Sequence, residues 1–175
     1  MKETIMYAKY NQECNKIIYE LLDKMSNDDR EKDRGSFCGS LSELFRHNVG
    51  TTIYFLELYK TALAGNAAAI KAISVLEKLP KLSDGTLQET QWKELKSMTA
   101  AVDAAYVEMA KALNESDMNL PVKIDWFGGS PDTVPLSFLL SQLLVHNTHH
   151  RGQISQILDS LKIEHDYSGI DLSFL

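Results

Sequence analysis

Four apolar repeats at helical spacing constrain the fold of this 175-residue chain more than any other feature. In each repeat, apolar side chains recur every three or four residues, which places them on one face of an α-helix. The repeats cover residues 7–25, 41–59, 92–113 and 136–161. Helices with a single apolar face bury it by packing against one another. We therefore predict an all-α fold, a four-helix bundle that forms one domain over residues 1–175.

Two pairs of polar residues mark helix starts. Ser40 is followed three residues later by Glu43, and Thr86 is followed at the same spacing by Glu89. Both pairs match the capping box, in which the first side chain accepts a hydrogen bond from the backbone three residues on. We therefore predict that the second and third helices begin beside these pairs.

The two long connections carry signals of their own. Residues 65–81 include an alanine-rich segment closed by a proline, which predicts a short extra helix. Three prolines and a glycine pair between residues 114 and 135 exclude a continuous helix. Alternation over residues 122–126 predicts a short strand, so a loop or a small hairpin is expected before the last helix. Because long connections permit crossovers, we predict an up-up-down-down helix order.

Charge and composition exclude several classes of function. The formal net charge is −6, with an isoelectric point near 5.3, which argues against binding the phosphate backbone of a nucleic acid. The N-terminal residues lack the apolar region of a signal peptide, and no apolar run approaches the length of a membrane span. Cys14 and Cys38 have no CxxC spacing and are interpreted as buried structural thiols. We expect a cytoplasmic protein without a membrane or nucleic-acid partner.

Three of the five histidines lie in one stretch of five residues inside the last repeat. At about 100° per residue, His150 falls near the centre of the apolar face, His146 on its flank, and His149 on the water-facing side. Residues four apart share one face of a helix, so His146 and His150 could both reach one metal ion.

A stable catalytic zinc site usually has three protein ligands. The remaining histidines are His47 and His165, and His47 is preferred because it lies in a long helical repeat. A histidine beside an apolar face is more often a hydrogen-bonded core residue, and HxxxH without the glutamate of HExxH is a weak motif. The residues alone leave both interpretations open.

Four segments make the chain similar to the DinB/YfiT-like superfamily of metal-binding four-helix bundles. The most specific is His146-xxx-His150-Arg151-Gly152-Gln153, which resembles the family's HxxxHRGQ signature. Residues 39–47, residues 126–129 and the ending 171–175 are also similar to family segments. The resemblance implies that His47, His146 and His150 are the three metal ligands, and that His149 is not one.

Residues around this motif have candidate roles in support of a site. Gln153 lies on the same flank as His146 and could hydrogen-bond a ligand ring, with a solvated glutamine as the alternative. Arg151 could neutralise a carboxylate or an acidic group of a partner subunit, although a surface salt bridge is favoured. A glycine inside a helix usually indicates close packing, so Gly152 is predicted to contact another helix.

Three further residues are candidates for the lining of a pocket. They are Tyr10, Asn11 and Trp126, with core or lid positions as the alternative.

The resemblance implies a divalent ion, zinc or nickel first, with iron and manganese also able to accept imidazole. It favours a thiol S-transferase in which the metal activates a low-molecular-weight thiol toward an electrophile. The alternatives are a metal-dependent hydrolase and a non-enzymatic, stress-associated homodimer whose metal staples two helices together. A homodimer is expected from the resemblance alone.

Overall fold

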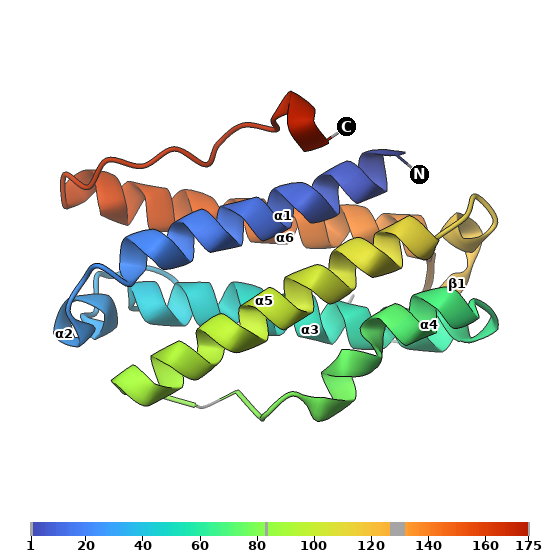
Figure 1. Cartoon of the computed structure of the whole chain (residues 1–175), viewed down its shortest axis with the longest axis horizontal. Coiled ribbons are helices and arrows are strands. Elements are labelled where there is room, and N and C mark those ends of the chain that lie inside the picture. Colours follow the sequence, from blue (N-terminus) through green and yellow to red (C-terminus); the bar gives the residue numbers. More distant parts are fainter. Residues whose placement is uncertain (1, 83, 127–131, 175) are drawn as a thin grey trace.

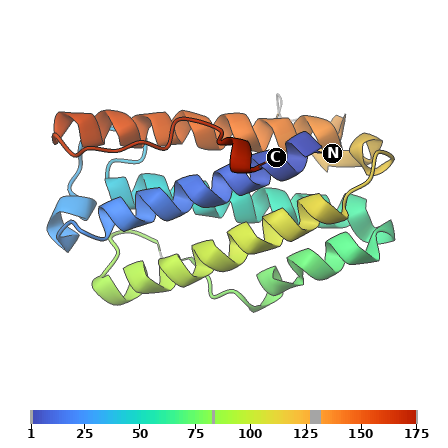
Figure 2. The same cartoon turned by 45° about the horizontal axis from the view of Figure 1, so that its top comes forward.

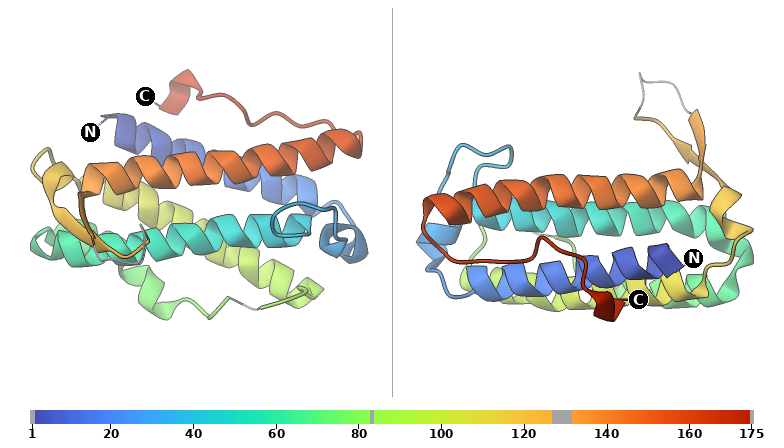
Figure 3. Two further views of the ribbon diagram at one scale, coloured as in Figure 1. Left: turned by 180° about the vertical axis from the view of Figure 1, so that it is seen from behind. Right: turned by 90° about the horizontal axis from the view of Figure 1, so that it is seen from above.

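Two layers of two long helices form the body of the protein, as the computed structural model in Figure 1 shows. In one layer α1 (Lys2–Leu22) packs against α5 (Glu89–Ala112), and in the other α3 (Leu41–Ala62) packs against α6 (Leu136–Ser160). The two layers are separated most clearly in the view from above in Figure 3. The structure describes residues 2–82, 84–126 and 132–174. The predicted all-α bundle is confirmed.

The order of the helices differs from the prediction. A compact connection that holds α2 (Asn27–Glu31) joins α1 to α3, so these two helices run in opposite directions (Figure 1). The chain then returns along the bundle through α4 (Ala67–Ile73), so α5 starts at the same end as α3. The predicted up-up-down-down order is therefore wrong, and the order is up-down-down-up. The connection from α3 to α5 spans the length of the bundle (Figure 1).

Two short elements lie where the sequence predicts them, and α2 was not predicted. The extra helix in residues 65–81 is α4, and the hairpin before the last helix consists of β1 (Pro121–Ile124) and β2 (Asp132–Pro135). These strands are antiparallel, with Val122 opposite Val134. The described residues also form four 3-10 turns: Leu63–Gly65, Ser74–Lys78, Asp117–Asn119 and Leu172–Phe174.

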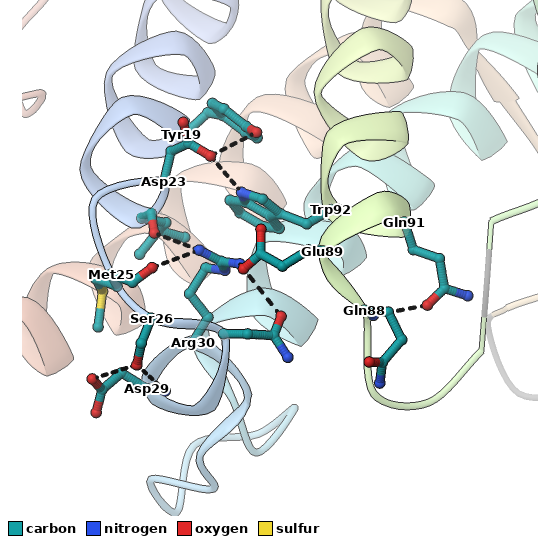
Figure 4. Close-up of polar contacts among 12 residues, drawn as sticks. Tyr19, Asp23, Met25, Ser26, Asp29, Arg30, Gln88, Glu89, Gln91 and Trp92 are labelled. Carbon is teal, nitrogen blue, oxygen red and sulfur yellow. Dashed lines mark hydrogen bonds and ion pairs between the residues drawn. The ribbon is translucent and has the colours of Figure 1, made fainter.

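One predicted cap is confirmed and the other is wrong. The Ser40 hydroxyl accepts a hydrogen bond from the Glu43 N–H at 3.1 Å at the start of α3. The cap of α5 is Gln88 instead of Thr86, and Gln88 exchanges capping hydrogen bonds with Gln91. Figure 4 shows both residues at the start of that helix.

A buried cation explains why Glu89 does not serve the predicted cap. Arg30 is 1% exposed and donates to the Met25 carbonyl at 2.7 Å, and its other nitrogen forms an ion pair with Glu89 (Figure 4). The guanidinium also lies over the Trp92 ring. Because the Glu89 carboxylate neutralises Arg30, it is held away from the cap position.

The core is apolar at both ends of the bundle and polar between them. One apolar cluster includes Leu56 and Leu139, and the other includes Phe45 and Ile154. Each long helix contributes buried polar residues where the clusters meet: Asn11, Asn15, Asn48, Thr52, Thr99, Asp103, Asn147 and Arg151. We call these eight residues the polar layer.

The C-terminal segment returns along the bundle beside α1 and α6, as Figure 2 shows. Tyr167 anchors it. The Tyr167 hydroxyl contacts Ser155 at 2.7 Å, and its backbone carbonyl accepts from the Cys14 thiol at 3.3 Å. Cys14 is buried and Cys38 is partly buried, and both are free thiols.

Candidate metal centre

The last helix presents its three clustered histidines to three different environments. His150 is buried at 5% exposure, His146 is half-buried, and His149 is exposed. This agrees with the helical-wheel prediction, because residues four apart share a face and residue 149 lies on the opposite side of the helix. Sequence periodicity therefore places His146 and His150 inward.

The third histidine comes from the neighbouring helix. His47 lies on the second turn of α3, which Ser40 caps and which packs beside α6. Its ring centroid is 5.0 Å from that of His146 and 4.6 Å from that of His150. Ligand nitrogens of the three rings all lie within 4.8 Å of one another. The structure thus brings together all three predicted metal ligands.

The nitrogen spacing fits a metal ion. The Nε2 atoms of His47 and His146 are 3.2 Å apart. Two imidazole nitrogens on one tetrahedral zinc ion, each about 2.0–2.1 Å from it, are about 3.3 Å apart. No carboxylate belongs to the cluster among the described residues, so the donor set is three imidazoles.

Gln153 fixes the orientation of one ring. Its Oε1 lies 2.7 Å from the Nδ1 of His150. An amide oxygen only accepts, so the ring nitrogen donates the proton, which leaves the Nε2 of His150 as the basic nitrogen. Gln153 therefore has the position predicted for a residue that supports a metal-ligating ring.

The surroundings of His47 and His146 favour the neutral form of these two rings. Burial, with the nearby His150 acting in the same direction, lowers the pKa of His47 below its ordinary value. Burial and the same neighbour lower the pKa of His146 to about 4. At neutral pH both rings are therefore unprotonated, as metal coordination requires.

A residue that the sequence analysis missed covers the cluster. Phe37 is 77% exposed, and its ring centroid lies 6.1 Å from that of His47 and 5.7 Å from that of His150. It stands on a tight turn closed by the Gly39 N–H donating to the Ser36 carbonyl at 3.0 Å. Gly39 has a φ of +84°, a conformation that favours glycine. No periodic signal marks this turn, because it lies outside the helices.

Arg151 lies in the core, and the favoured surface salt bridge is wrong. It is 2% exposed, donates to the Asn11 side chain at 2.9 Å, and lies over the Tyr10 ring at 4.9 Å. Asn11 in turn donates to the buried carboxylate of Asp103 at 2.9 Å. Arg151 therefore balances a buried acid through a shared asparagine within the polar layer.

Gly152 also differs from its predicted role. It is exposed, and a Cβ placed on it would have no neighbour within 4 Å. No helix packs closely there. A helical glycine can therefore stand on the solvent side, where it costs helix stability without making a contact.

The three predicted pocket residues occupy different places. Tyr10 and Asn11 are buried beside Arg151, and Trp126 is partly buried and donates to the Tyr54 hydroxyl at 2.8 Å. Their role in lining a pocket stays a prediction. Of the segments similar to the family, residues 127–129 and Leu175 lie outside the described residues.

The fold and the cluster together define a helical bundle with a three-histidine centre of the kind that can hold a metal ion. The model of the DinB family matches residues 1–161, and the chain belongs to that family. No curated relative and no solved structure matches the chain significantly. Over the part of the chain that the structure describes, no helix is long and apolar enough to cross a membrane.

Proposed function

We propose that this protein is a metal-dependent enzyme of the thiol S-transferase type. In this proposal His47, His146 and His150 hold one divalent ion, and a small thiol is transferred to an electrophile. The observation that carries the proposal is the convergence of three imidazoles from α3 and α6, two of them with Nε2 atoms 3.2 Å apart. This spacing matches two nitrogen ligands of one tetrahedral ion.

The donor set favours chemistry at an open metal position. Held by His47, His146 and His150, a divalent ion would keep its full charge, because imidazole is a neutral ligand, and it would lower the pKa of a water or thiol bound to it. Gln153 holds the His150 ring by its Nδ1–H, and Phe37 shields the rings from bulk solvent on one side. Zinc and nickel are the preferred ions, and iron and manganese also accept imidazole.

Thiol transfer is favoured over hydrolysis by what surrounds the histidines. Hydrolases commonly use a carboxylate as general base, and no Asp or Glu of the described residues joins the cluster. A free thiol has a pKa near 8.5, so it needs only a small shift to ionise at neutral pH. The sulfur forms a bond to the electrophilic carbon, whose leaving group departs with the bonding electrons, and the thiol proton passes to solvent.

The first test is elemental analysis of protein purified without a metal-affinity tag. Wild type is compared with His47→Ala, His146→Ala and His150→Ala, and His149→Ala serves as the matched control because that ring is exposed. We expect about one metal ion per chain in the wild type and the control, and a loss in the other three variants. A metal-free wild type, even after incubation with divalent ions, would remove the basis of the proposal.

A second test separates the enzyme from a structural staple. Because the histidines join α3 to α6, a metal that only ties these helices should raise the unfolding temperature without creating a thiol site. Binding of small thiols to the metal-loaded protein, absent after metal removal, supports the enzyme. Sedimentation velocity on the same samples tests the predicted homodimer.

A further inference from the structure

A cleft of about 420 Å³ opens beside the histidine cluster. Its walls are the turn that precedes α3 and the second half of α6, and Phe37 and Gln153 belong both to the cleft and to the surroundings of the histidines. The remaining lining residues are Arg34, Gly35, Ser36, Gln156, Ile157 and Ser160. A volume of this size accommodates a small molecule.

The charge of the cleft is opposite to that of the protein. Arg34 is the one charged side chain among its described lining residues, whereas the whole chain carries a net charge of −6. Asp33 lies in the same turn, but it is exposed and its carboxylate accepts the Gly35 N–H at 2.8 Å. A divalent ion on neutral histidines would add to the positive potential of the cleft.

The guanidinium of Arg34 is largely removed from water, and neighbouring groups neutralise its positive charge only in part. Its side chain is 14% exposed, one nitrogen donates to the Asp29 carbonyl at 3.0 Å, and the nearest carboxylate oxygen, also from Asp29, is 3.9 Å away. Its Nε is buried and has no hydrogen-bond partner, and Asp29 is the only described partner of its two terminal nitrogens. A guanidinium with unused donors binds carboxylate and phosphate groups strongly.

We infer that this cleft binds the anionic group of a small-molecule substrate, with Arg34 as the residue that recognises it. The inference rests on the proposed function, since it places the reacting end of the substrate at the three histidines and its carboxylate or phosphate beside Arg34. Ser36, Gln153 and Gln156 supply neutral hydrogen-bonding groups around the same space. Specificity between charged and neutral thiols then depends on Arg34.

Two thiols that differ in charge test this assignment. Cobalt(II)-loaded protein is titrated with 3-mercaptopropionate and with 2-mercaptoethanol, and binding is followed by the thiolate-to-cobalt absorption. We expect Arg34→Gln to weaken 3-mercaptopropionate about tenfold and to leave 2-mercaptoethanol within about twofold. Lys111→Gln, which removes one positive charge from α5 outside the cleft, should change neither. Equal weakening of both thiols by Arg34→Gln, or no weakening, would overturn the inference.

A metal-free measurement separates this inference from the proposed function. Metal-free protein is titrated with propionate, and the backbone amide signals of Gly35 and Ser36 are followed by NMR. Saturable shifts that disappear in Arg34→Gln but persist in Arg34→Lys support the anion site. They do so even if the protein does not bind cobalt, because a failure to bind cobalt would refute only the metal centre. Shifts that are absent in the wild type, or unchanged in Arg34→Gln, overturn the inference that Arg34 binds an anionic group.

Discussion

Removing the hydrogen bond between Gln153 and His150 should weaken metal binding by a predictable amount. The bond joins the Gln153 Oε1 to the His150 Nδ1 at 2.7 Å in a partly buried site. A neutral hydrogen bond contributes about 0.5–1.5 kcal/mol, and a metal on the opposite nitrogen makes the N–H a stronger donor. We therefore expect Gln153→Leu to cost about 1.4 kcal/mol, which is a tenfold rise in the zinc dissociation constant.

The assay is competition for zinc against a chromophoric chelator of known affinity. Gln156→Leu is the matched control, because Gln156 also lines the cleft but is exposed and has no hydrogen bond to a histidine in the described structure. Gln153→Glu should bind zinc more tightly than wild type, since a carboxylate is a stronger acceptor. If Gln153→Leu and Gln156→Leu have the same zinc affinity, the hydrogen bond does not position His150 and the reasoning fails.

Three further outcomes follow from the same structure. Burial raises the pKa of Asp103 to about 7, so the native state retains a proton that the unfolded chain releases near pH 4. The free energy of unfolding should therefore fall as pH rises from about 4 to 7, and Asp103→Asn should flatten this slope in urea titrations; an unchanged slope would assign it to other groups. Gly152→Ala should stabilise α6 by about 1 kcal/mol in thermal unfolding, because the added methyl meets nothing within 4 Å. Gly50→Ala is its control and should gain less, since its Cβ would lie 3.2 Å from Leu82; equal gains would contradict the packing argument. Zinc at about a hundred times its dissociation constant should stabilise the protein by about 2.7 kcal/mol in denaturant titrations, and a similar gain in His47→Ala would argue against a three-histidine site.

Local signals account for the parts of the fold that were predicted correctly. Helical periodicity located the four long helices, and prolines with alternating residues located the hairpin at β1 and β2. The Ser40 cap is equally local, because it needs only the backbone of the next turn. The α5 cap was mispredicted because Glu89 forms an ion pair with Arg30, which is 59 residues away in the chain.

The same distinction applies to the candidate site. The spacing of His146 and His150 put both on one face of a helix, and the family resemblance, together with its long helical repeat, selected His47. Phe37 and Arg34 carried no such signal, since their positions depend on how one turn packs over α6. Arg151 was assigned to the surface because an arginine beside a glycine gives no indication of a buried partner on another helix.

The sequence by itself determined where the four long helices lie and which apolar side chains of each are buried, because both depend on the 3.6-residue period of a single helix. Only the tertiary structure decided the up-down-down-up order, the meeting of His47 with the α6 pair, and the burial of Arg151 near Asp103. These features depend on contacts between helices, whose energies are summed over many residues far apart in the chain. The candidate metal centre depends on both the helical period and the packing between helices. The period of α6 aligns His146 and His150, and the packing of α3 against α6 brings His47 to them.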